Sequence, residues 1–287
     1  MKEITIKEAL VRASALLKES SIENPFFESQ LLLKHVLECR LTDLIAKDNN
    51  FLTKDQLLQF KAMIDKRAKH YPVAYIIGYK EFMGIKFKVT KDVLIPRPDT
   101  EVLIEWALSK LELTNGIKTV VDVGAGSGAI GLTIAKLCAD VRVHATEISE
   151  KSLKIAQNNA VDIGVKNKVT FYNGSLLEPI INREIKADMI LSNLPYIPED
   201  EYESLGKTVK EYEPKSALVG GETGLEIYSQ LLSQVGKVLR SEGVIAFEIG
   251  YNQQKASLEL LKEWGFKNSE VLYDLGGHPR VVVGQKK

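Results

Sequence analysis

The most constraining feature of this sequence is the alternation of strand-like and helix-like segments that begins after Gly116. Runs rich in β-branched residues alternate with segments in which apolar residues recur at helical spacing. Such alternation predicts a parallel sheet with helices on both of its faces. The predicted strands cover residues 119–123, 141–148, 169–172, 189–192 and 244–249, and the predicted helices cover residues 130–137, 152–164, 225–239 and 253–264.

Two further strands are predicted at the end of the chain, at residues 269–274 and 281–284, around a Gly-Gly-His-Pro turn. A turn of this length cannot hold a helical crossover, so the last strand should be antiparallel. We therefore expect a seven-stranded, mostly parallel sheet that begins near residue 117.

The first 70 residues carry helix signals instead. Helix-start patterns occur at Thr5, Asn24 and Thr53, and amphipathic segments follow each of them. Apolar and polar residues then alternate around Met83-Gly84, which predicts a β-hairpin. These patterns predict a helical bundle at residues 1–70, a hairpin connector at 71–95 and a larger α/β domain at 96–287.

The chain of 287 residues carries 38 Lys and Arg against 38 Asp and Glu, so its formal net charge is zero. Proteins that hold nucleic acid through its phosphates usually have a basic surplus, and we expect no direct nucleic-acid binding. Cys39 and Cys138 are far apart, which excludes a disulfide scaffold and a cysteine-based zinc site. The four histidines are scattered as well, and we predict no metal site.

No membrane or targeting segment is predicted. The longest uncharged run near the middle of the chain, residues 123–135, is shorter than the ~20 apolar residues that a membrane span needs. The N-terminal sequence MKEITIKEAL lacks the apolar core of a signal peptide. We therefore expect a cytoplasmic protein that does not act at a membrane.

A glycine-rich turn, Asp122–Gly128, joins the first predicted strand to the next helix. Its glycines let the backbone turn sharply and approach a ligand, and the helix N-terminus offers free N–H groups. Glu147 follows the second strand, at about the ~20-residue distance at which a carboxylate binds ribose hydroxyls. Together they predict an adenosine-containing cofactor. With Ala129 the turn also fits the dinucleotide pattern, so it leaves open which cofactor binds.

The sequence Ser192-Asn-Leu-Pro-Tyr196 follows the fourth predicted strand, again at the edge where such sheets bind ligands. It is similar to the (Asp/Asn/Ser)-Pro-Pro-(Tyr/Phe/Trp) motif of S-adenosylmethionine-dependent amino-methyltransferases. With its flanks, nearly the whole chain resembles the PrmC/HemK family, which methylates the side-chain amide of a glutamine in peptide-chain release factors. The flanks that match are Pro72-Val-Ala-Tyr-Ile-Ile-Gly78, Val93-Leu-Ile-Pro-Arg-Pro-Asp-Thr-Glu101, Asn193-Leu-Pro-Tyr-Ile-Pro198, and Glu213-Pro-Lys-Ser-Ala-Leu218 with Gly220-Gly221.

The resemblance implies a class I S-adenosylmethionine-dependent methyltransferase. Its fold would be a Rossmann-like, seven-stranded, mostly parallel sheet with an antiparallel last strand, preceded by a small N-terminal helical bundle and a β-hairpin connector. Because the helical domain has no polar constellation and precedes the connector, we expect it to recognise the protein substrate, a release factor that presents its glutamine-bearing loop, and we expect the enzyme to be a monomer. The residues expected to bind the cofactor are Gly124, Ala125, Gly126, Ser127, Gly128, Glu147, Leu176, Leu177 and Asn193.

The resemblance also implies which residues carry the reaction. An amide nitrogen is a poor nucleophile, because its lone pair is delocalised into the carbonyl group. Two acceptors aimed at its N–H bonds, the Asn193 side-chain oxygen and the residue 194 carbonyl, would hold it in a reactive geometry. The catalytic and substrate-binding residues are then Asn193, Leu194, Pro195 and Tyr196, with Tyr196 lying against the amide and Arg97 at the mouth of the site.

Two positions depart from the family pattern. Leu194 stands where the family has its first proline, and it supplies the same backbone carbonyl without the locked φ angle of proline. Leu176 stands where the family often has aspartate, which removes a side chain that could bind the adenine amino group.

Other functions fit part of the pattern. An exocyclic base amine in DNA or RNA would suit the same Asn–aromatic motif, but the residues after the motif are acidic and such a rim repels phosphate. A nicotinamide oxidoreductase would leave residues 193–196 without a role, and a non-catalytic binding module would treat the altered motif as lost activity. We predict an S-adenosylmethionine-dependent protein-glutamine N5-methyltransferase that acts on release factors.

Overall fold

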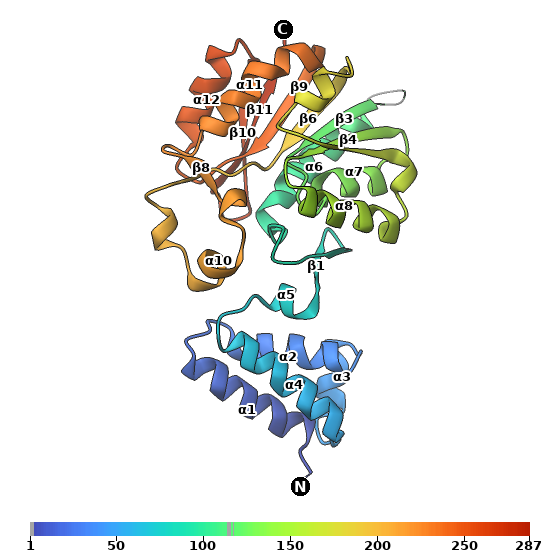
Figure 1. Ribbon diagram of the computed structural model, residues 1–287, viewed down its shortest axis with the longest axis vertical. Helices are drawn as coiled ribbons and strands as arrows, with labels where there is room; N and C mark the ends of the chain where they lie inside the picture. Colours follow the sequence, from blue (N-terminus) through green and yellow to red (C-terminus); the bar gives the residue numbers. More distant parts are fainter. Residues whose placement is uncertain (1–2, 114–115, 117) are drawn as a thin grey trace. The chain divides into compact units, whose positions relative to one another are not determined.

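The computed structural model describes residues 3–113, 116 and 118–287. Residue 117, near which the sequence predicts the sheet to begin, lies outside the described residues. The chain divides into two compact units, one of residues up to Tyr79 with Gly206–Tyr212 and one of Lys80–Leu205 with Glu213–Lys287 (Figure 1). The domain boundaries near residues 70 and 95 stay predictions, because contact density does not define which segments fold independently.

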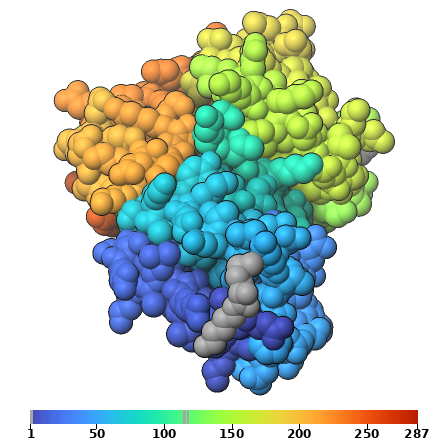
Figure 2. Space-filling view, turned by 60° about the horizontal axis from the view of Figure 1, so that its bottom comes forward, coloured from blue at the N-terminus to red at the C-terminus, as the bar shows by residue number. Residues whose placement is uncertain are grey.

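The first unit is helical, and its residues up to Tyr79 run from dark blue to cyan in Figure 2. Thr5 and Thr53 close the capping boxes that the sequence predicts, each accepting a hydrogen bond from the backbone of the third helical residue. Asn24 precedes its helix without a side-chain cap, so the start of that helix depends on Pro25. The helices are α1 (Ile6–Glu19), α2 (Pro25–Val36), α3 (Leu41–Ala46), α4 (Lys54–Arg67) and α5 (Val73–Ile77), packed around Leu10, Leu17, Leu32, Leu33 and Phe60.

A distant segment, α10 (Lys207–Tyr212), completes the helical unit. The buried guanidinium of Arg67 pairs with Glu28 and donates to the Thr208 hydroxyl at 3.1 Å. The Tyr212 hydroxyl donates to the carbonyl of Lys69 at 2.6 Å. The arginine is therefore a structural residue that fixes α10, because its charge is balanced and its donors are used.

The second unit begins with the predicted hairpin, β1 (Tyr79–Phe82) and β2 (Ile85–Lys88). Met83 and Gly84 both have positive φ angles, which confirms the turn. Asn159 fastens β2 to the larger sheet, because its amide bonds both backbone groups of Lys88 and the carbonyl of Ser127. Asn159 lies in α8 (Glu150–Ile163), so these bonds join the hairpin to that helix.

The main sheet has seven strands in the order β10-β11-β9-β6-β3-β4-β5. Only β11 runs against the other six, which confirms the mostly parallel sheet and the antiparallel last strand. The strands are β3 (Lys118–Val123), β4 (Val141–Glu147), β5 (Val169–Asn173), β6 (Ala187–Ser192), β9 (Leu239–Glu248), β10 (Lys267–Tyr273) and β11 (Pro279–Gln285); a separate short pair is β7 (Ile197–Pro198) and β8 (Val219–Gly221).

Helices cover both faces of this sheet (Figure 1). Val120 packs into one core and Val121 into the other, as the alternation of side chains along a strand requires. One face carries α6 (Glu101–Glu112), α7 (Ala129–Leu137) and α8 (Glu150–Ile163); the other carries α9 (Glu178–Ile181), α11 (Glu226–Val238) and α12 (Gln254–Glu263).

Strand β9 begins five residues before the predicted position at 244. It starts at Leu239, directly after α11 ends at Val238. Arg240, Ser241 and Glu242 are polar and exposed, so the sequence there has the pattern of a turn, and the pairing of β9 with β6 is irregular between Leu239 and Val244. Within the described ranges, no helix combines the length and apolar character that crossing a bilayer requires.

Candidate active site

The glycine-rich turn between β3 and α7 is fixed against the end of β4. The N–H groups of Gly124 and Ala125 donate to the carbonyl oxygen of Thr146 at 2.9 and 3.0 Å. Gly124 has a φ of +74°, and a Cβ there would lie 2.7 Å from Cδ2 of Leu194. Glycine is therefore needed for the turn and for the close approach of Leu194, which brings the two sequence motifs together.

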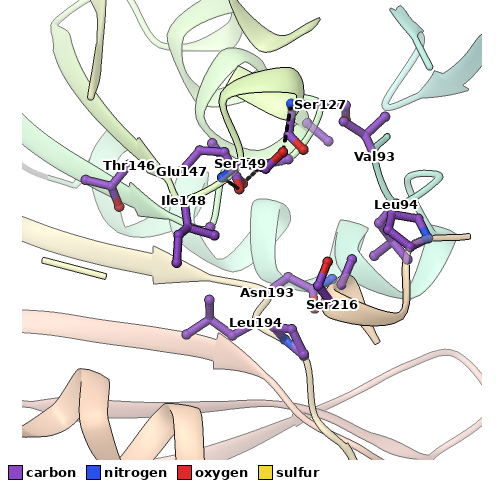
Figure 3. A pocket seen from close by; sticks show the side chains of 18 of the residues that line it. Val93, Leu94, Ser127, Thr146, Glu147, Ile148, Ser149, Asn193, Leu194 and Ser216 are labelled. Atoms are coloured by element: carbon purple, nitrogen blue, oxygen red, sulfur yellow. Dashed lines mark hydrogen bonds between the residues drawn. The ribbon is translucent and has the colours of Figure 1, made fainter. Parts of the chain in front are cut away.

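Glu147 lies at the end of β4 and is 8% exposed. Its two carboxylate oxygens accept hydrogen bonds from the N–H groups of Gly126 and Ser149, each at 2.8 Å. These bonds hold the side chain at the wall of a cavity (Figure 3). A carboxylate has about four lone-pair sites, so each oxygen can accept one further hydrogen bond, such as one from a ribose hydroxyl.

The cavity has a volume of about 500 Å³, within the range of roughly 300–1,000 Å³ that is usual for small-molecule sites. Figure 3 shows the β4 end with Glu147 on one side and Asn193, Leu194 and Ser216 on another. The structure thus brings most of the predicted site residues to one place. Those that line the cavity are Arg97, Gly124, Ala125, Gly126, Ser127, Glu147, Leu176, Asn193, Leu194 and Pro195.

Three other predicted residues lie outside the cavity wall. Gly128 precedes α7 with a φ of +85°. Leu177 is fully buried in the core beneath Leu176, and its N–H donates to Gln234 at 2.8 Å. Tyr196 is part-buried, and its hydroxyl donates to Glu248.

The side chain of Asn193 is held by residues that the sequence pattern did not single out. Its amide nitrogen donates to the Thr100 hydroxyl at 3.1 Å, and that hydroxyl donates to Glu248 at 2.6 Å. Burial raises the pKa of Glu248, while hydrogen bonds from Thr100 and Tyr196 lower it. Thr100 and Glu248 could have been suspected only from their positions, one at a helix start and one at the end of a strand.

Arg97 at the cavity wall is paired with the buried carboxylate of Glu213. The same carboxylate accepts the N–H of Ile95 at 3.1 Å. Glu213 therefore fixes the proline-rich segment of residues 95–98 on one side of the cavity. Gly220 packs directly against the backbone of the Asn193–Tyr196 motif. A Cβ on Gly220 would overlap the carbonyl oxygen of Pro195.

Asp122 lies beneath the glycine-rich turn and is fully buried. One of its oxygens accepts the N–H of Gly131 at 2.8 Å, and the other has no hydrogen-bond partner among the described residues. Burial raises the pKa of Asp122 to about 7, and the charge of Glu147 raises it further, against the Gly131 hydrogen bond. The carboxyl therefore titrates near neutral pH.

With this geometry in place, comparisons with known proteins decide the family. Residues 8–78 match the model of the PrmC N-terminal domain, and residues 100–209 match that of the methyltransferase small domain. A release factor glutamine methyltransferase from Clostridium acetobutylicum is 42% identical over 278 residues, which is 97% of each chain. The chain belongs to the PrmC family of release factor glutamine methyltransferases. A family member from Bacillus cereus is 38% identical over 283 residues, covering 98% of this chain and 99% of that one.

Solved structures show the same fold. The hMettl16 catalytic domain, solved in complex with the MAT2A 3′UTR hairpin 6, gives a TM-score of 0.57. The match covers 83% of this chain and 84% of that one at 15% identity, which supports the class I methyltransferase fold alone. A methyltransferase of the PrmC family takes its methyl group from S-adenosylmethionine. The free lone pairs of Glu147 and the open side of the turn at Gly126, where an added Cβ would meet no atom closer than 4.0 Å, fit the nucleoside of this cofactor.

Replacing Glu147 with alanine should weaken S-adenosylmethionine binding. The loss should be about 1.5–3 kcal/mol, or ~10–150-fold in Kd, because two charged hydrogen-bond acceptors disappear. Calorimetric titration measures it, and Glu178→Ala, an exposed carboxylate outside the cavity, is the control. Equal affinities for the two variants would remove Glu147 from the cofactor site.

The titration of Asp122 should make stability depend on pH. Because its pKa is raised to about 7 in the folded protein, its contribution is full below the unfolded pKa near 4 and is lost as pH rises toward 7. Between pH 5 and pH 8 the free energy of unfolding should fall by about 2–3 kcal/mol more in the wild type than in Asp122→Asn. Urea unfolding without cofactor measures this; parallel pH profiles of the two proteins would contradict it.

Proposed function

We propose that this enzyme transfers the methyl group of S-adenosylmethionine to the side-chain amide nitrogen of a glutamine in a peptide-chain release factor. Family membership over nearly the full length supports the reaction, since relatives that carry this name match both units of the chain. The observation that carries the proposal is the orientation of Asn193. Its amide nitrogen is bound to Thr100, so its oxygen is the atom left to accept a substrate N–H at the cavity.

The reaction requires two acceptors for one primary amide. The Asn193 side-chain oxygen and the Leu194 carbonyl belong to consecutive residues, and each can accept one N–H of the glutamine amide. Holding both N–H bonds directs the nitrogen lone pair and fixes its distance from the reacting carbon. The bound cofactor supplies an electrophilic methyl group on a sulfonium.

Proton transfer does not need a general base before attack. The amide N–H bonds stay in place while the new N–C bond forms, and the nitrogen then becomes a strong acid that loses its proton to solvent. The acceptors stabilise the positive charge that develops on the nitrogen. Burial raises the pKa of the Tyr196 hydroxyl, which keeps that hydroxyl protonated as a donor to Glu248 and unsuited to act as a base.

Different residues of the cavity wall would bind the cofactor and the substrate glutamine. The glycine-rich turn, Glu147 and Leu176 would hold the nucleoside, and Asn193, Leu194 and Pro195 would hold the glutamine amide. Arg97 is paired with Glu213, so it would shape the mouth rather than bind a free carboxylate. Tyr196 lies outside the cavity wall, and through its bond to Glu248 it would hold the loop of residues 193–196 in place.

Substituting Asn193 with alanine should lower turnover by ~10²–10³-fold, the scale of removing one preorganised polar partner. Cofactor affinity should change far less. Single-turnover transfer of labelled methyl groups to a release factor, with S-adenosylmethionine saturating, measures the effect. Wild-type turnover in this variant would refute the proposed chemistry, and methylation of bare nucleic acid in place of release factor would favour the base-amine alternative.

We infer that the helical unit recognises the release factor, and that the enzyme acts as a monomer in the cytoplasm, where translation ends. The helical unit presents large apolar side chains to solvent at the start of α2, with Phe26 48% and Phe27 52% exposed. Such exposed aromatic residues are typical of protein-binding surfaces.

Replacing Phe26 and Phe27 together with serine should raise the KM for whole release factor by ~10-fold or more, because exposed aromatic anchors often contribute over 1 kcal/mol each. The rate with a short glutamine peptide should stay unchanged. Leu113→Ser, which removes an exposed apolar side chain from the other unit, is the matched control. Equal effects on whole factor and on peptide would exclude a docking role for these phenylalanines.

A further inference from the structure

Glu248 lies at the end of β9, 1% exposed, and it is bonded on three sides by hydroxyl groups. Its carboxylate accepts the Thr100 hydroxyl at 2.6 Å and the Tyr196 hydroxyl at 3.0 Å. Its backbone carbonyl accepts the Tyr228 hydroxyl at 2.6 Å. One buried residue thus collects three donors that come from different parts of the chain.

The carboxylate fixes the side chain of Asn193 through Thr100. A threonine hydroxyl has one proton, and the short bond to Glu248 uses it. The Thr100 oxygen can then only accept, so it takes the N–H of the Asn193 amide at 3.1 Å. The reverse orientation would place an acceptor against an acceptor, and the Asn193 oxygen therefore faces away from Thr100.

The carbonyl of Glu248 fixes the backbone of Leu194 through Tyr228. The Tyr228 hydroxyl lies 2.6 Å from the Glu248 carbonyl and 3.4 Å from the Leu194 carbonyl, so its single proton serves the nearer one. The hydroxyl oxygen then accepts the N–H of Leu194 at 3.0 Å. Proline at position 194 would have no N–H to give.

We propose that Glu248 is a positioning residue that aims both amide acceptors, the Asn193 oxygen through Thr100 and the Leu194 backbone through Tyr228. This role rests on the proposed glutamine methylation. The Tyr228 bond also supplies order that the missing proline would otherwise give to the loop. Glu248 itself does not touch the substrate, and its effect is transmitted through the two hydroxyl groups.

The Thr100 arm can be tested by removing one hydroxyl. Thr100→Val keeps the shape of the side chain and should lower kcat by about 10–100-fold, with the KM for release factor and the Kd for S-adenosylmethionine little changed. Thr100→Ser restores the hydroxyl and should recover most of the lost turnover. Thr133→Val is the control, because Thr133 is equally buried and bonds only within α7.

A double variant separates positioning from direct contact, since Thr100 also reaches the cavity wall. If Thr100 acts through Asn193, then adding Thr100→Val to Asn193→Ala should cost no further turnover. Multiplied losses in the double variant would overturn the proposal. So would a normal kcat in Thr100→Val while Asn193→Ala is impaired, a result that leaves the glutamine chemistry intact. Normal turnover in Asn193→Ala would overturn both.

The Tyr228 arm has its own cycle. Tyr228→Phe should lower kcat in the wild-type background, and the loss should be smaller in a Leu194→Pro background, where the N–H is already absent. Equal losses in the two backgrounds would refute the link to Leu194. Cofactor affinity and thermal unfolding of each variant show that it is folded, and Tyr172→Phe, which loses only a bond to His144, is the matched control.

Discussion

The parallel pairing of β3 with β4 on one side and with β6 on the other is the constraint on which the site depends. The register places Val123 opposite Thr146 and opposite Ser192. The residues that follow these three, Gly124, Glu147 and Asn193, therefore leave the sheet at the same level of one edge. A slip of one residue in either pairing would turn the side chains of the displaced strand to the other face and separate the two halves of the site.

The same geometry explains how much could be predicted from the sequence. Glu147 and Asn193 could be predicted because each stands at the end of an apolar strand, and the end of such a strand can be recognised from the local sequence. Thr100 and Glu248 were not, because their hydrogen bond joins residues 148 positions apart and leaves no periodic pattern. The placement of α10 in the helical unit was missed for the same reason, since it depends on the distant Arg67. Leu177 shows the limit within a motif: adjacent leucines face opposite ways, and pattern alone cannot assign which one meets the cavity.

Several carboxyl groups are buried at the edge of the sheet where the site lies. Asp122, Glu147 and Glu248 are all nearly or fully buried, whereas Arg97 is paired with Glu213. Burial raises the pKa of Asp122 and of Glu248 and so favours their neutral forms, whereas Glu147 lines the cavity and is the acidic side chain placed to favour a positively charged ligand such as a sulfonium. Asp122 is the clearest sign of a cost to folding, because one of its oxygens has no partner among the described residues and its pKa is raised by burial. Such costs are typical of functional sites, where the arrangement that serves a ligand is not the one that is most stable.

The leucine at position 194 changes how heat acts on the active-site loop. Proline restricts the backbone by covalent geometry, in the unfolded chain as much as in the native one and at every temperature. Leu194 is held instead by the Tyr228 hydroxyl and by packing against Gly124, contacts that exist only in the native state. The loop with Leu194 therefore loses more conformational entropy when it becomes ordered than a loop with proline would. For this reason it should become disordered more readily as the temperature rises. This favours a catalyst whose upper working temperature is set by the loosening of one loop, below the temperature at which the whole chain unfolds.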